Sequence, residues 1–290
     1  MADTQIQHVS DTAFWIAHYR ALETKRSDAL FRDPLAERLS GDRGEKIARM
    51  MPRRFLTAWA VVVRTCIIDD YIRTAIAGGV DTILNLGCGL DTRPYRMDLP
   101  ESLLWIEADY PDLIAFKESH LGNEKPRCRL RRVKLDLANE PGRQQLFRSA
   151  DAQSTKLLIL TEGVVPYLSE ADVGLLADDL KAMEHSRFWI VDYFAPEVIK
   201  LRKRMTRRTM QNAPFKFWPA DWFGFFEAHG WRRKDIRYLA EEGDRLKRPI
   251  QLSMLMKFVL GLRAIFRSKE RRGAAKRFVG YALLERNTAA

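Results

Sequence analysis

The stretch 81–95 contains the feature that most constrains how this chain folds. A short apolar run at 83–86 ends in the turn Gly87-Cys88-Gly89. Such a run is typical of a buried parallel strand, and glycines directly after it allow the backbone to come close to a ligand. We therefore expect a nucleoside cofactor at this turn.

The residues after the turn indicate which nucleoside fits. A dinucleotide-binding turn needs a third glycine near position 92, where this chain has Thr92. The next apolar run ends in Glu107 and Asp109, roughly 20 residues after the first glycine, where a carboxylate holds a ribose. Asp91 and Arg93 stand where a diphosphate would bind. These charges suit a nucleoside with an ammonium and a carboxylate, such as S-adenosylmethionine, better than a pyrophosphate.

The composition is that of a globular protein with one large α/β domain. Its 290 residues are 46% hydrophobic and 30% charged, and no run of about 18 apolar residues could span a bilayer. Residues 1–20 lack the apolar core of a signal peptide, and the three cysteines have no metal-ligand spacing. We expect a cytoplasmic protein without a metal site. The net charge of +11 leaves nucleic acid and an anionic small substrate open as partners.

Helices are predicted ahead of the first strand, so residues 1–80 are expected to form an N-terminal helical cap. Apolar residues at helical spacing predict helices over about 12–22 and 53–77, and Gly78-Gly79 ends the second of these. Another short helix begins near Pro34, and the polar stretch 40–45 is expected to be a loop.

From residue 82 onward strands and helices alternate, which predicts an α/β, Rossmann-like fold with a mostly parallel sheet flanked by helices. About seven strands are expected, at 82–86, 103–107, 131–135, 156–161, 188–193, 235–239 and 278–284. In such sheets ligands bind beyond the carboxyl ends of the strands. Gly87, Asp109, Asp136 and Glu162 all fall there, and together they indicate a cofactor site more strongly than any single motif.

Several motifs, in a fixed order between residue 12 and about 193, resemble the leucine carboxyl methyltransferase family. Within it they are most similar to the bacterial polyketide O-methyltransferases of the tetracenomycin type. The resembling segments are Thr12-Ala-Phe-Trp-Ile-Ala-His-Tyr-Arg-Ala-Leu-Glu23, Phe31-Arg-Asp-Pro34, Arg64-Thr-Cys-Ile-Ile-Asp69, Asn85-Leu-Gly-Cys-Gly-Leu-Asp-Thr-Arg-Pro-Tyr95, Glu107-Ala-Asp-Tyr-Pro111, Asp136-Leu137 and Thr161-Glu-Gly163. The family usually has alanine where Cys88 stands. The resemblance implies a class I methyltransferase fold, S-adenosylmethionine as cofactor and methyl transfer to oxygen.

The resemblance also implies which residues hold S-adenosylmethionine. In the order of the chain they are Arg64, Gly87, Cys88, Gly89, Asp91, Glu107, Asp109, Asp136, Leu137 and Glu162. The two glycines would border the methionine part of the cofactor, whose carboxylate would pair with Arg64. Asp109, or else Glu107, would hold the ribose hydroxyls. Asp136 and Leu137 would flank the adenine, and Glu162 would lie near the amino acid end.

Other side chains have both a functional and a structural interpretation. Tyr19, Arg20 and Arg93 are candidates for contact with the acceptor, although salt bridges or packing between cap and sheet explain them as well. His18 is more readily a partly buried helix residue than a base. Cys88 suits a small residue in a crowded turn better than a nucleophile. A pocket for an aromatic substrate is one interpretation of Trp218, Trp222, Phe223 and Phe226, but their helical spacing favours the core for most of them.

Two stretches have no counterpart in these motifs. Residues 196–219, which include a basic run at 200–208, are interpreted as a substrate lid inserted after the fifth strand, with a solvated charged helix as the alternative. Residues 252–277 are apolar and then basic. Weak peripheral membrane contact is one interpretation of them, and a helix packed on the domain with a basic outer face is the preferred one.

The sequence therefore predicts an S-adenosylmethionine-dependent O-methyltransferase. Its acceptor is expected to be a carboxylate or phenolic hydroxyl of a small, polyketide-like intermediate of secondary metabolism. Protein carboxyl methylation is one alternative, and a non-catalytic, nucleic-acid-associated domain of the same fold is another. Against the second, the basic runs contain no interleaved aromatic residues, so no nucleic acid partner is expected. A dehydrogenase is disfavoured by the missing third glycine.

Overall fold

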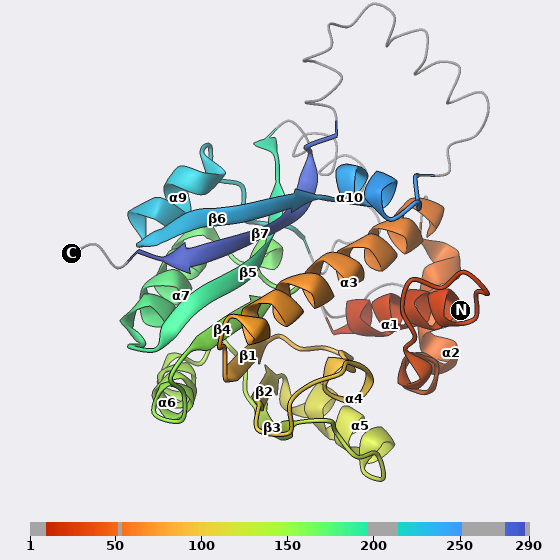
Figure 1. Cartoon of the computed structure of the whole chain (residues 1–290), viewed down its shortest axis with the longest axis horizontal. Helices are drawn as coiled ribbons and strands as arrows, with labels where there is room; N and C mark the ends of the chain where they lie inside the picture. The colour runs from red at the N-terminus through yellow and green to blue at the C-terminus, as the bar shows by residue number, and fades with distance from the viewer. Residues whose placement is uncertain (1–9, 52–53, 197–213, 251–275, 288–290) are drawn as a thin grey trace, which may run out of the picture.

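The computed structural model describes residues 10–51, 54–196, 214–250 and 276–287. These residues form a seven-stranded sheet with helices on both faces (Figure 1). The strands are β1 (Thr82–Leu86), β2 (Leu104–Asp109), β3 (Arg129–Lys134), β4 (Leu157–Thr161), β5 (Ser186–Phe194), β6 (Trp231–Tyr238) and β7 (Val279–Arg286). The predicted α/β architecture is confirmed.

The order of strands across the sheet is β3-β2-β1-β4-β5-β7-β6. The strands from β3 to β5 are all parallel, whereas β7 is antiparallel to both β5 and β6. Because β7 runs in the opposite direction, its beginning lies at the edge where the parallel strands end. Residues from the start of β7 therefore join the strand ends where the cofactor site was predicted.

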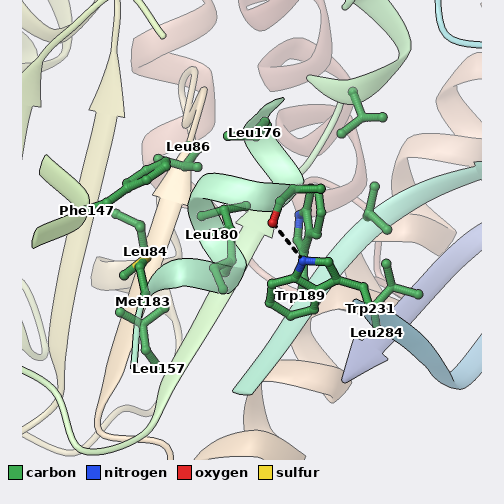
Figure 2. Close-up of a cluster of buried hydrophobic side chains, with 14 of the residues drawn as sticks. Leu84, Leu86, Phe147, Leu157, Leu176, Leu180, Met183, Trp189, Trp231 and Leu284 are labelled. Carbon is green, nitrogen blue, oxygen red and sulfur yellow. Dashed lines mark hydrogen bonds between the residues drawn. The ribbon is translucent and has the colours of Figure 1, made fainter. Parts of the chain in front are cut away.

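One face of the sheet is covered by α6 (Glu140–Asp151), α7 (Glu170–Ala182) and α9 (Trp222–Ala228). Figure 2 shows the apolar cluster between these helices and the sheet, with Leu180 of α7 near Trp189 of β5 and Trp231 of β6. Trp222 and Phe226 of α9 belong to the same cluster. The prediction that most of these aromatic residues are core residues is confirmed.

The opposite face is crossed by the long helix α3 (Arg54–Ala77) (Figure 1). Its buried side chains, among them Ile68 and Ile72, pack on Ile83, Leu158 and Ile190 of the sheet. The predicted stop at Gly78-Gly79 is confirmed, because Gly79 has a φ of 87° that glycine adopts without strain.

The two preceding helices, α1 (Asp11–Thr24) and α2 (Pro34–Met50), pack together beside α3 and share a separate apolar cluster. Asp33 caps α2 through a hydrogen bond from the Ala36 N–H at 3.1 Å. The division into a cap over 1–80 and a sheet domain stays a prediction, since α3 itself packs on the sheet.

Some local predictions were wrong. Residues 40–45 belong to α2 rather than to a loop; the chain only kinks at Gly41, whose φ of 48° and ψ of −160° are not helical. The polar composition of this stretch misled the prediction, although Ser40 and Gly44 are buried within the helix. The helices α6 and α10 (Leu239–Arg245) were not predicted.

Most of the proposed lid (196–219) and of the membrane-contacting segment (252–277) lies outside the described residues. Among the helices that the structure does describe, none combines the length and apolarity needed to cross a bilayer.

Candidate functional site

A cavity of about 640 Å³ lies where the ends of the parallel strands face α1 and α3. Most of the residues predicted to hold the cofactor line it, namely Arg64, Gly87, Cys88, Gly89, Asp91, Asp109, Asp136, Leu137 and Glu162. Arg20 also lines it, whereas Glu107, Tyr19 and Arg93 do not. The structure thus brings the predicted strand ends together at one site.

The glycine turn forms one wall of this cavity. Gly87 and Gly89 have φ values of 64° and 52°, in the left-handed region that side chains other than glycine rarely adopt. A Cβ on Gly87 would overlap the Val164 side chain, and one on Gly89 would lie 3.3 Å from the Cβ of Ala13. The Gly89 N–H donates to Asp109 Oδ2 at 2.6 Å. Both glycines are therefore required by backbone shape and by close packing.

Asp109 ends β2 and lines the cavity beside the turn. Its second oxygen, Oδ1, accepts from the Tyr110 N–H at 2.7 Å. Burial raises the pKa of this carboxyl above its ordinary value, although both backbone N–H groups oppose the rise. Asp109 thus has an oriented carboxylate in the position predicted to hold ribose hydroxyls.

Glu107 was the second candidate for that role, and the structure contradicts it. Its side chain is fully buried, with Oε1 accepting from Lys117 Nζ at 2.7 Å and Oε2 from Arg132 Nε at 3.0 Å. Both carboxylate oxygens are used inside the protein, away from the cavity. Glu107 neutralises a buried lysine of α5 (Pro111–Leu121) and so has a structural role.

Arg64 of α3 faces the end of β4. Its Nε lies 2.8 Å from Glu162 Oε1, but the Nε–H is buried without a hydrogen-bond acceptor in the described structure. Burial alone would raise the pKa of Glu162, yet Arg93 and Arg64 outweigh burial and lower it. A buried guanidinium beside an ionised acid at the cavity wall can bind the carboxylate and the ammonium of an amino acid group, because it offers both signs of charge.

Arg93, predicted as a substrate contact, is a structural residue. It begins the short helix α4 (Arg93–Arg96) and is 2% exposed. Its Nε donates to Asp69 at 2.7 Å, and its Nη1 donates to Asp91 and Glu162 at 2.9 and 2.8 Å. Asp91 also accepts from Asn85 at 3.0 Å. Arg93 therefore fixes the acids around the turn and does not reach the cavity.

Tyr19 and Arg20 were also predicted to contact the acceptor substrate. Tyr19 is 4% exposed and is not among the residues that line the cavity, so its contact with a substrate stays a prediction. Arg20 lines the cavity, but its Nε donates to Asp33 at 2.8 Å and its Nη2 to the Leu90 carbonyl at 2.6 Å. The salt bridge ties α1 to the start of α2 within the predicted cap, and the hydrogen bond to Leu90 ties α1 to the turn after β1.

The other residues singled out in the sequence are Cys88, Asp136, Leu137 and His18. Cys88 is 6% exposed, and burial raises the pKa of its thiol well above the ordinary value, so a thiolate nucleophile is disfavoured. Asp136 is exposed, and its Oδ1 accepts from the Ala138 N–H at 2.9 Å. Leu137 is partly buried beside it. His18 does not line the cavity, in agreement with the structural interpretation.

The sequence reasoning missed the other half of the cavity. Asp192 and Phe194 of β5 line it together with Tyr281 of β7, Tyr167 of the 3₁₀ turn η1 (Val165–Tyr167), and Phe215. The rings of Tyr167 and Phe215 lie 4.9 Å apart, and those of Phe194 and Phe215 lie 6.1 Å apart. Asp192 is a polar residue near a strand end, which is the signal that identified Asp109 and Glu162.

Comparison with known proteins agrees with this geometry. The leucine carboxyl methyltransferase family matches residues 13–181, which is more than half of the chain. The chain belongs to this family. The family match, together with relatives named as S-adenosylmethionine-dependent methyltransferases, identifies the protein as an enzyme, a methyltransferase that uses S-adenosylmethionine.

Curated relatives support this assignment, and solved structures share the fold. A protein of Streptomyces avermitilis named "Putative S-adenosyl-L-methionine-dependent methyltransferase" is 33% identical over 261 residues, covering 82% of this chain and 88% of that protein. One of the same name from Mycobacteroides abscessus is 30% identical over 283 residues, covering 83% and 90%. A DUF574-family crystal structure from S. avermitilis has a TM-score of 0.57 at 14% identity, covering 93% and 96%. A Thermobifida fusca structure described as a methyltransferase has a TM-score of 0.53 at 13% identity, covering 94% and 95%. These two structures share the fold.

Proposed function

We propose that this leucine carboxyl methyltransferase family member transfers a methyl group to an oxygen atom of a small, largely apolar molecule. The acceptor oxygen belongs to a carboxylate or a phenolic hydroxyl, as in the polyketide-like intermediates that its sequence resemblance implies. The observation that carries the proposal is the composition of the cavity, whose charged half adjoins an aromatic half containing Tyr167, Phe194 and Phe215. One half suits a charged nucleoside and the other a flat apolar acceptor.

In the charged half, several residues fit S-adenosylmethionine. The Arg64 guanidinium lines the cavity and would bind a carboxylate, and Glu162, its ion-pair partner, would bind an ammonium. Asp109 would accept hydrogen bonds from ribose hydroxyls, and Asp136 with Leu137 would contact the adenine. When bound, the cofactor supplies a methyl group on a positively charged sulfur. The protein's own residues would hold the acceptor oxygen close to that methyl group and exclude water, which is worth roughly 7–11 kcal/mol in favourable cases.

Two measurements test this proposal. Calorimetry with S-adenosylmethionine and S-adenosylhomocysteine should show binding of both, and folded protein that binds neither would refute the proposed donor site. Mass analysis after incubation with a metabolite extract and labelled donor should then show a small molecule that has gained one methyl group on oxygen.

Protein carboxyl methylation is the second candidate, because the family is described by methylation of a leucine carboxyl group. The same labelled incubation, carried out with a protein fraction in place of metabolites, distinguishes the two. If the labelled methyl group appears in protein in a form that base removes, and does not appear in small molecules, the result would favour protein carboxyl methylation. We expect no nucleic acid substrate, and binding of RNA or DNA with a steep salt dependence would contradict that expectation.

A further inference from the structure

Asp192, like Asp109, is held by uncharged hydrogen-bond donors, unlike the ion-paired carboxylates Glu162 and Asp91 of the same cavity. Its Oδ1 accepts from the Tyr281 hydroxyl at 2.8 Å, and its Oδ2 accepts from the Gly163 N–H at 2.8 Å. Both donors are neutral, and within the described residues no arginine or lysine forms a salt bridge with it. Glu162 and Asp91, by contrast, are ion-paired with arginines. Asp192 is thus an oriented carboxylate whose charge is not matched by a direct cationic partner.

The register of the sheet explains this arrangement. Asp192 on β5 lies directly opposite Tyr281 on the antiparallel strand β7, so both side chains project from the same face. Phe194, two residues further along β5, shares that face. The strand order places β5 and β7 beyond β4, on the side away from β2 and β3. Asp192 therefore lies in the aromatic half of the cavity, while Asp109 and Asp136 lie in the charged half.

The groups that face Asp192 come from three elements. Arg64 of α3 stabilises its negative charge, Glu162 after β4 opposes it, and Tyr281 of β7 stabilises it by hydrogen bonding. Burial is the largest influence, and it raises the pKa of Asp192 above the ordinary value for aspartate. A carboxylate with a raised pKa is a stronger base than an exposed one and is better matched to receiving a proton near neutral pH.

We propose that Asp192 is the base that accepts the proton of a hydroxyl acceptor, and that the enzyme therefore prefers phenols to carboxylates. The inference rests on the proposed methyl transfer to oxygen. In this step the O–H bond of the acceptor breaks and its proton goes to the Asp192 carboxylate. The oxygen forms a bond to the methyl carbon as the carbon–sulfur bond breaks, and that electron pair returns to sulfur. The products are a methyl ether, S-adenosylhomocysteine and a protonated Asp192, which then loses its proton to solvent.

The same carboxylate disfavours an acceptor that is already ionised. A carboxylate acceptor needs no base, and beside Asp192 it would bring two like charges together in a buried site. A phenol gains a hydrogen bond to Asp192 in place of that repulsion. Tyr281 acts as a positioning residue, because its hydroxyl orients the Asp192 oxygen and keeps the pKa of that carboxyl from rising further.

The test uses the full chain in complex with S-adenosylhomocysteine and two probes of similar shape, 4-nitrophenol and 4-nitrobenzoate. In the wild-type complex we expect nitrophenol to bind at least tenfold more tightly than nitrobenzoate at neutral pH. The absorbance of bound nitrophenol should show a pKa above that of the free compound, because Asp192 opposes the phenolate charge. In Asp192→Asn the two probes should bind with similar affinity, and the shift in the nitrophenol pKa should disappear.

Rates provide the second readout, using a panel of substituted phenols and the matching benzoates as acceptors. Asp192→Asn should lower kcat for phenols by about 10²- to 10⁴-fold, the usual contribution of a positioned base. Tyr281→Phe should move the acidic limb of the pH–rate profile to higher pH. Asp179→Asn is the control, since Asp179 of α7 pairs with Arg143 of α6 and does not line the cavity. It should change neither the probe preference nor the pH profile.

The outcomes separate this inference from the proposed function. Failure to bind S-adenosylhomocysteine would refute the donor site and with it the base. Normal binding of S-adenosylhomocysteine with no binding of any phenol would overturn the inference alone, as would wild-type phenol rates in Asp192→Asn. Methylation of benzoates but not phenols by the wild-type enzyme would also overturn it, while leaving methyl transfer to oxygen intact.

Discussion

Arg93 and Asp69 form a buried ion pair, with 2.7 Å between Nε and Oδ1, that ties the turn after β1 to α3. The same guanidinium also bonds Asp91 and Glu162, so one side chain neutralises acids from three parts of the chain. We expect Arg93→Met to reduce the free energy of unfolding by about 3–5 kcal/mol, because three buried carboxylates lose the partner that they share, even though Asp69 keeps Arg96 and Glu162 keeps Arg64. Urea denaturation measures the change.

Arg49→Met provides the matched control for that prediction. Arg49 pairs with Glu45 at 2.6 Å on the surface of α2, with both side chains largely exposed. Its loss should change the free energy of unfolding by at most about 1 kcal/mol. Equal effects of the two substitutions would contradict the structural role of Arg93.

Asp109 and Glu107 stand two residues apart on β2 but should respond differently to removal of their charge. Asp109→Asn should weaken S-adenosylhomocysteine binding by about tenfold or more, equivalent to ~1.4 kcal/mol, because a charged acceptor is replaced by a neutral one. Glu107→Gln should mainly lower the free energy of unfolding, because Lys117 loses its buried partner. Calorimetry and urea denaturation of both variants distinguish the roles. A larger loss of affinity in Glu107→Gln would reverse the assignment.

Gly87→Ala should damage both the turn and the donor site. The substitution forces alanine into a φ of 64° and makes its Cβ overlap Val164. We expect about 1–3 kcal/mol of destabilisation from the backbone strain and the overlap, together with loss of S-adenosylhomocysteine binding. Gly79→Ala is the control, since it has a φ of 87° and no atom within 4 Å of its Cβ position. Gly79→Ala should lower the melting temperature but leave the affinity for S-adenosylhomocysteine unchanged.

The buried acids predict how stability depends on pH. Burial opposes ionisation of Asp69, Asp91 and Glu162, but the neighbouring arginines outweigh it and lower these pKa values in the folded state. Groups of this kind stabilise the protein above their ordinary pKa of about 4, and this contribution is lost as pH falls toward the lowered values. The raised pKa values of Asp109 and Asp192 act in the opposite direction and offset part of the loss.

We therefore expect the urea concentration at the midpoint of unfolding to decrease once the pH is lowered below ~4. The stability difference between wild type and Arg93→Met should shrink over the same range, because protonated carboxyls no longer need the arginine. A difference that stays constant down to the lowest pH would show that the ion pairs are not what distinguishes the two proteins.

The charged half of the cavity was predictable because local motifs encode it. The glycine turn and the acids at positions 109, 136 and 162 follow apolar runs, and parallel strands bring such ends to one edge. The roles of Glu107 and Arg93 were not predictable in this way. Their partners Lys117 and Asp69 lie 10 and 24 residues away, and only the packing of α5 and α3 brings them within bonding distance.

The aromatic half escaped prediction for a related reason. Asp192 has the strand-end signal, but its partner Tyr281 is 89 residues further along the chain, in a strand whose direction the sequence does not reveal. The kink at Gly41 was missed because one glycine within a polar stretch indicates a loop as readily as a bent helix.

The position of β7 has a consequence for how the enzyme is made. This strand follows every other described strand in the chain, yet it lies between β5 and β6. Until residue 286 has left the ribosome, β5 has an open edge and β6 has no partner in the sheet. A nascent chain can therefore fold its donor half while Asp192 still lacks Tyr281. Ribosome-stalled chains ending before β7 should accordingly expose a strand edge that attracts chaperones or other nascent chains.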